Sequence, residues 1–190
     1  MKKNNFRSMS TQTLTYCALL AALSVVLARL MGLMPSESAR FSIEAVPIIL
    51  AGLLFGPLPG ALVGFAADFV GCLFSAYGYN PLFCLPPILY GLSAGLFRYR
   101  VAGKNQLFWL IAAVFCPVVL GSIFYQSAAL AYVYYDGVFM KGFMLHLSTR
   151  SVQFAITFVL DVAAVWFLLR SGLFHRIGVW PPAARKEQEQ

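Results

Sequence analysis

Long apolar segments without charge are the feature that most limits the fold of this chain. The segment from Leu107 to Tyr132 carries no charged side chain, and it exceeds the roughly 20 residues that a helix needs to cross the hydrocarbon core of a bilayer. Charged residues make up 11% of the sequence, whereas soluble domains carry roughly 25%. A helix satisfies its own backbone hydrogen bonds in lipid. The sequence therefore predicts an all-α integral membrane protein.

Six apolar segments predict a bundle of six transmembrane helices in one domain, residues 1–176, followed by a polar tail, residues 177–190. The second segment is short for a full crossing, so we expect it to be entered from a loop folded into the protein. Prolines are expected to distort the fourth helix at Pro86 and Pro87 and to kink the fifth at Pro117. The expected helices are Thr11–Met31, Phe41–Phe55, Pro59–Ser75, Leu82–Phe97, Leu107–Tyr132 and Met144–Leu169.

The distribution of Lys and Arg predicts the orientation. An even number of crossings places both termini on one side, and cytoplasmic termini put ten of the 14 basic residues inside and four outside. The positive-inside rule favours that arrangement, and it explains the net charge of +7 without nucleic acid. We expect a multi-pass protein of the cell membrane. The four outer basic residues are Arg29, Arg40, Lys141 and Arg150.

The third expected helix carries a stripe of small residues with one carboxylate. Gly60, Gly64, Asp68 and Gly71 follow at helical spacing, so they share one face. Small residues let membrane helices approach closely, and a carboxylate in lipid is costly unless it faces the bundle interior. Asp68 is therefore expected inside the bundle, where it either binds a ligand or pairs with Arg150 or Arg40.

The sixth expected helix carries a polar stripe that runs from Arg150 through Thr157 to Asp161. Polar side chains on one face of a membrane helix should point into the bundle. Asp161 is interpreted mainly as a structural hydrogen-bonding group. Arg150 lies at the outer mouth, where it either extends to the interface or holds a ligand.

The first expected helix carries Ala18 and Ala22 four residues apart, a groove of small residues that can dock another membrane helix. The partner could belong to this chain or to another one. Arg29 lies eleven residues after Ala18, in nearly the same helical direction. Arg29 therefore serves a ligand only if the helix bends or ends before it.

These features together resemble the substrate-binding subunits of energy-coupling factor (ECF) vitamin transporters, in their folate-specific branch. The resemblance covers most of the first hundred residues and implies a non-catalytic, six-helix subunit that captures folate at the outer face. It implies three partners, a transmembrane coupling protein docked at Ala18 and Ala22 and two cytosolic ATPases. The matching stretches are ALLAALSVVLARL, RFSIEAVPIILAGLLFGPLPGALVGFAADFVG, YGYNP and LYGLSAGLFR.

Folate chemistry assigns roles to the remaining candidates. Asp68 or Glu44 could accept both N–H donors on the pterin edge, because charge-assisted hydrogen bonds are the strong ones. Arginine holds carboxylates in pairs, which suits the dianionic glutamate tail, with Arg40 and Arg150 best placed and Arg29 as a further candidate. Aromatic rings that could stack on the pterin, or form the ordinary interfacial belt, are Phe41, Tyr77 and Tyr79.

Other functions fit the residues less well. The chain has no phosphate-binding G-x-x-x-x-G-K-[ST] run, no metal-spaced histidine pair and no nucleophile–base set, so we expect no enzyme, no metal and no cofactor. The four cysteines lie in apolar segments and are interpreted as buried hydrophobic residues. The alternatives are the same fold with riboflavin, pantothenate or a thiamine precursor as ligand, an enzyme acting on lipid head groups, and a self-contained secondary carrier.

Overall fold

The computed structural model describes residues 10–32, 43–73, 81–134, 139–176 and 180. Helices account for nearly all of these residues, and no strand occurs among them. The helices are α1 (Thr11–Gly32), α2 (Ala45–Phe55), α3 (Pro57–Leu73), η1 (Pro81–Phe83), α4 (Leu85–Val101), α5 (Gln106–Pro117), η2 (Val118–Tyr125), α6 (Gln126–Tyr134), α7 (Phe139–Arg170) and α8 (Leu173–Arg176).

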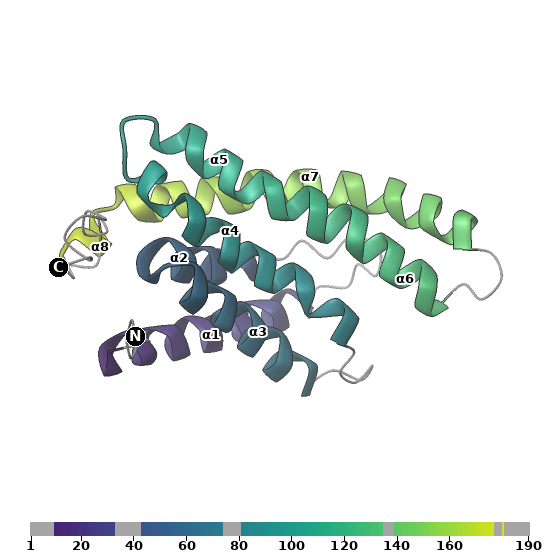
Figure 1. The fold of residues 1–190 in the computed structure, drawn as a ribbon, viewed down its shortest axis with the longest axis horizontal. Helices are drawn as coiled ribbons and strands as arrows, with labels where there is room; N and C mark the ends of the chain where they lie inside the picture. Colours follow the sequence, from purple (N-terminus) through teal and green to yellow (C-terminus); the bar gives the residue numbers. More distant parts are fainter. Residues whose placement is uncertain (1–9, 33–42, 74–80, 135–138, 177–179, 181–190) are drawn as a thin grey trace, which may run out of the picture.

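The helices form six rods in the described ranges, because α5, η2 and α6 follow one another without a break (Figure 1). This confirms the expected all-α membrane bundle. Three stretches are long and apolar enough to cross a membrane, namely 11–29, 106–133 and 139–170, while α2 and α3 are shorter apolar helices. The first turn of α1 and the short α8 lie at the same end of the bundle. The cytoplasmic assignment of that end stays a prediction from charge.

The short second helix was expected, and α2 is the most buried element of the described chain. Every residue from Ala45 to Leu54 is buried, and Ile49 and Leu53 have no exposed surface. Helix α2 contacts α1, α3, α4 and α7, so neighbours surround it (Figure 1). A helix that is apolar on all sides is stable where packing covers all sides.

The turn between α2 and α3 depends on one glycine. Gly56 has φ +110° and ψ 179°, a backbone conformation that essentially only glycine adopts. Its N–H donates to the carbonyl oxygen of Gly52 over 2.9 Å, which ends α2. Pro57 then begins α3, where its missing N–H costs nothing.

Glycines also set the distance between α2, α3 and α4. A Cβ atom on Gly60 would lie 2.5 Å from the Gly91 carbonyl oxygen and 2.6 Å from the Gly52 Cα, closer than real Cβ contacts. A Cβ atom on Gly95 would meet the backbone of Pro57. The three helices therefore pack backbone against backbone, as the small-residue spacing predicted.

The two prolines of α4 behave differently from the expectation. Pro86 and Pro87 lie in the first turn of α4, where proline fits a helix start, so they begin the helix and do not distort it. Pro117 is followed by the π-helix η2. Pro117 lacks the N–H that an α-helix needs, and the wider π-helical turn follows at that point.

Candidate functional site

The structure describes six of the predicted site and docking residues: Arg29, Glu44, Asp68, Arg150, Ala18 and Ala22. The other four predicted site residues, Arg40, Phe41, Tyr77 and Tyr79, lie outside the described residues. The described part of the chain contains two polar groups among apolar helices, one around Asp68 and one around Asp161.

The first polar group joins α1, α3 and the start of α4. Arg29 donates a hydrogen bond to the carbonyl oxygen of Gly71, and the Cys84 thiol lies within hydrogen-bonding reach of the Asp68 carboxylate. The charges of Arg29 and Asp68 both act on Cys72. Two of the predicted site residues, Arg29 and Asp68, are therefore brought to one place.

Asp68 is half-buried, as expected for a carboxylate on an inward face. Its Oδ2 atom is buried and has no hydrogen-bond partner among the described residues. Of the two ion pairs expected as alternatives, that of Asp68 with Arg150 is not found in the described chain, and that with Arg40 falls outside the described residues. Arg150 instead places its guanidinium 5.8 Å from the centre of the Phe154 ring.

Arg29 departs from the direction that helical spacing suggested. Ala18 and Ala22 are exposed on the surface of α1, whereas Arg29 reaches across to the last turns of α3. The long arginine side chain, at the last turn of α1, can bend away from the direction of its own Cα–Cβ bond toward α3. Ala18 and Ala22, the predicted docking residues, and Arg29 therefore need not compete for the same surface.

The second polar group lies where α2, α4, η2 and α7 meet. Asp161 is 0% exposed, and neither of its carboxylate oxygens has a hydrogen-bond partner among the described residues. Tyr90 Oη and Ser122 Oγ are 3.2 Å apart and share one hydrogen bond. Asp161 and Glu44 both lie within electrostatic range of Tyr90, so two acidic side chains and two hydroxyls occupy one region.

Glu44 stands at the start of α2 and is exposed. Its backbone is fixed from α1, because the buried Ser24 hydroxyl donates to the Glu44 carbonyl oxygen over 2.7 Å. The region around Glu44 thus combines an exposed carboxylate with the buried carboxylate of Asp161. Acidic and hydroxyl groups of this kind accept hydrogen bonds from a ligand with N–H donors.

The polar stripe on α7 points into the bundle along most of its length, as predicted. Thr157 and Asp161 are buried, and Arg150 is half-buried. Thr157 donates back to the Gln153 carbonyl oxygen over 3.1 Å. The structure therefore aligns one arginine and one carboxylate on the inner face of the same helix.

Sequence reasoning missed Tyr90, Ser122 and Arg98. Tyr90 directly precedes Gly91, where α4 crosses α3, and Ser122 lies in the π-helix η2. The hydropathy of the sequence does not show that these two side chains are close together. Arg98 was counted only as a cytoplasmic positive charge. It is 9% exposed and donates to the Leu54 carbonyl oxygen at the end of α2 over 3.3 Å.

The described residues contain no group of three or more His, Cys, Asp or Glu side chains that could hold a metal ion. Their polar groups are hydrogen-bond acceptors, hydroxyls and arginines within an apolar wall. Such a set can form hydrogen bonds with a polar or anionic molecule inside the bundle.

Comparisons with known proteins agree with a membrane bundle that binds a small molecule. No curated protein sequence matches this chain. A crystal structure described as FolT bound with folic acid is similar, with a TM-score of 0.69 and 27% identity over 84% of this chain and 93% of that one. Residues 8–173, which include both polar groups, match the family described as ECF-type riboflavin transporter, S component. This integral membrane chain therefore belongs to the family of substrate-binding S components of ECF-type vitamin transporters.

Proposed function

We propose that the chain is a folate-binding S component that captures its vitamin at the outer face. The observation that carries the proposal is the likeness to FolT bound with folic acid, which extends over 93% of that chain. Riboflavin is the second candidate, because the matching family description names riboflavin. The two vitamins differ in charge, since folate carries a dianionic glutamate tail and riboflavin has no carboxylate.

Two regions of the structure support folate chemically. Asp68 has a buried carboxylate oxygen without a partner among the described residues, and a pterin edge supplies adjacent N–H donors that a carboxylate accepts together. The charges of Arg29 and Asp68 both act on Cys72, and Arg150 lies on the inner face of α7. Arg29 and Arg150, with Arg40, are proposed to hold the two carboxylates of the tail. Glu44 is proposed as the second acceptor, and Phe41, Tyr77 and Tyr79 as stacking rings.

A direct binding experiment separates the two vitamins. The detergent-solubilised protein is titrated with folic acid and with riboflavin, and binding is followed by isothermal calorimetry. We expect heat of binding with folic acid and none with riboflavin at the same concentrations. Binding of riboflavin alone would refute the folate assignment and leave the family membership intact.

A charge test then examines the arginines. Arg150→Ala removes a proposed charged contact worth about 1.5–3 kcal/mol, so folate affinity should fall by roughly 10- to 150-fold. Affinity for a neutral pterin without a glutamate tail should not change. Lys141→Ala is the matched control, because Lys141 is an exposed cation on the same helix. Equal losses for both ligands would contradict a role in holding the tail.

We propose that the exposed alanines of α1 dock the coupling protein, while two ATPases outside this chain supply the energy and this chain catalyses no reaction. Large apolar side chains flank Ala18 and Ala22, with Leu14 60% and Leu19 61% exposed. Ala18→Trp should prevent co-purification of the coupling protein. Val152→Trp, on the exposed face of α7, should leave the complex intact. An intact complex with Ala18→Trp would show that docking occurs elsewhere.

A further inference from the structure

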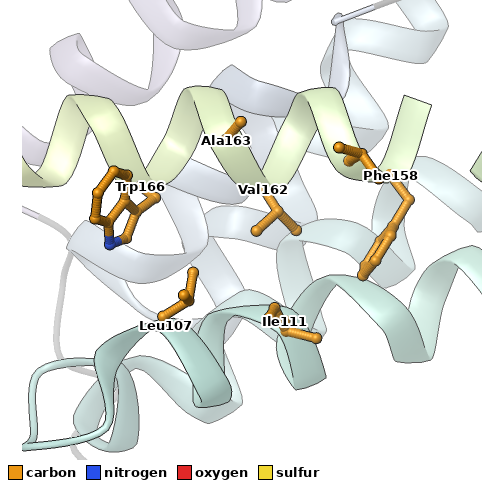
Figure 2. Close-up of a pocket in the computed structure, with 7 residues that line it drawn as sticks. Leu107, Ile111, Phe158, Val162, Ala163 and Trp166 are labelled. Carbon is orange, nitrogen blue, oxygen red and sulfur yellow. The ribbon is translucent and has the colours of Figure 1, made fainter. Parts of the chain in front are cut away.

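An apolar groove runs between α5 and α7 on the outside of the bundle. Figure 2 shows Leu107 and Ile111 of α5 opposite Phe158, Val162 and Trp166 of α7. The groove has a volume of 350 Å³, and all of its lining residues are apolar or aromatic. None of the residues of the two polar groups lines it.

The length of the groove matches one leaflet of a bilayer. Phe158 and Trp166 are eight positions apart on α7, which corresponds to about 12 Å at about 1.5 Å per residue. One half of a hydrocarbon core of about 30 Å is about 15 Å. A single acyl chain of one leaflet therefore fits along the groove from end to end.

One end of the groove carries positive charge. The Arg170 guanidinium lies 5.1 Å from the centre of the Trp166 ring, which itself lines the groove. Arg170 is exposed, and so is Lys104, three residues before Leu107. The start of α5 and the end of α7 lie at the same end of the bundle (Figure 1). Two cations therefore lie beyond the Trp166 end of an otherwise apolar groove.

The geometry points to an anionic phospholipid as the occupant of this groove, with one acyl chain between α5 and α7 and its phosphate against Arg170. An apolar wall that ends in a cation matches a molecule with an apolar chain that ends in an anion. Basic residues at the membrane surface attract anionic head groups by about 1 kcal/mol each. The acyl chain of a zwitterionic lipid fits the same groove, but its head group carries no net charge to attract Arg170.

The experiment compares two lipids of equal chain length. The full-length protein is purified in detergent, incubated with equimolar phosphatidylglycerol and phosphatidylcholine, and examined by native mass spectrometry. We expect preferential retention of one phosphatidylglycerol. Arg170→Gln should lower that retention about fivefold, which is the loss of about 1 kcal/mol. Lys141→Gln, at the opposite end of α7, is the control and should retain the lipid as the original protein does.

A second variant tests the groove itself. Ala163 lines the groove and is exposed, so Ala163→Phe fills the channel without entering the core. Retention of both lipids should fall in this variant. Equal retention of the two lipids by the original protein, or unchanged retention with Arg170→Gln, would overturn the proposal. Weaker assembly of Arg170→Gln with the coupling protein, at unchanged lipid retention, would assign the groove to that protein and also overturn it.

Discussion

Because α3 crosses α2 and α4 at close range, we predict that Gly60→Ala destabilises the protein. The new Cβ atom would lie 2.5 Å from the Gly91 carbonyl oxygen and 2.6 Å from the Gly52 Cα. Ordinary contact begins near 3.4 Å, so α3 must move by about 0.9 Å in a densely packed interior. Both obstacles are backbone atoms, which have no alternative rotamer.

Overpacking of a core costs about 1–3 kcal/mol, and the upper end applies where backbone must move. Gly71→Ala is the matched control, because it lies on the same helix and a Cβ atom there meets none of the described residues within 4 Å. Alanine is favoured over glycine in a helix by about 1 kcal/mol, a gain that both variants share. We therefore expect Gly60→Ala to be about 3 kcal/mol less stable than Gly71→Ala, or about 6–12 °C lower in Tm.

The assay is thermal unfolding of each variant in the same detergent, followed by tryptophan fluorescence without ligand. Gly71→Ala should unfold at or slightly above the temperature of the original protein. If Gly60→Ala unfolds at the same temperature as Gly71→Ala, the backbone contact between α3 and its neighbours does not limit the packing, and the reasoning fails.

Three further predictions concern polar groups inside the bundle. Asp161→Leu should raise the Tm of the ligand-free protein, because each unpartnered buried polar atom costs about 1–3 kcal/mol; a lower Tm would mean that Asp161 has a stabilising partner. Arg98→Met should lower the free energy of unfolding by about 1.5–3 kcal/mol, because the buried charged donor to the α2 carbonyl oxygen is lost. Arg100→Met, at an exposed position, should lower it by about 0.5–1 kcal/mol, because its contact with the Trp109 ring is lost. Equal losses in thermal unfolding would refute the stabilising role of the buried Arg98 hydrogen bond. Ser24→Ala removes the hydrogen bond that fixes the start of α2, so amide hydrogen exchange in the first turn of α2 should rise about fivefold for a loss of about 1 kcal/mol, and unchanged exchange would contradict that anchoring role.

Hydropathy and small-residue spacing were sufficient to predict the helices and the packed glycines. Length alone predicted that the second helix is too short to cross, and α2 is 11 residues long and enclosed by its neighbours. The last helix begins earlier than predicted, at Phe139, because its first turns are less apolar than the lipid-embedded part. Helix ends near the interface carry little hydropathy signal.

The polar groups were only partly predictable. The helical spacing of small and polar residues predicted that Asp68 and Asp161 lie on inward faces, and both have buried carboxylate oxygens in the structure. The hydrogen bond between Tyr90 and Ser122 joins residues 32 positions apart, and a period along one helix carries no information about such a pairing. The π-helix after Pro117 was also missed, because a wider turn leaves the hydropathy of the segment unchanged.

The glycine crossing of α2, α3 and α4 has a consequence for motion. Helices that touch through their main chains cannot slide by exchanging side-chain rotamers, so these three must travel as one rigid body. A shape change during the uptake cycle would then involve α1, α7 or the rod of α5, η2 and α6. The inner trio would serve as the fixed frame against which those helices are displaced.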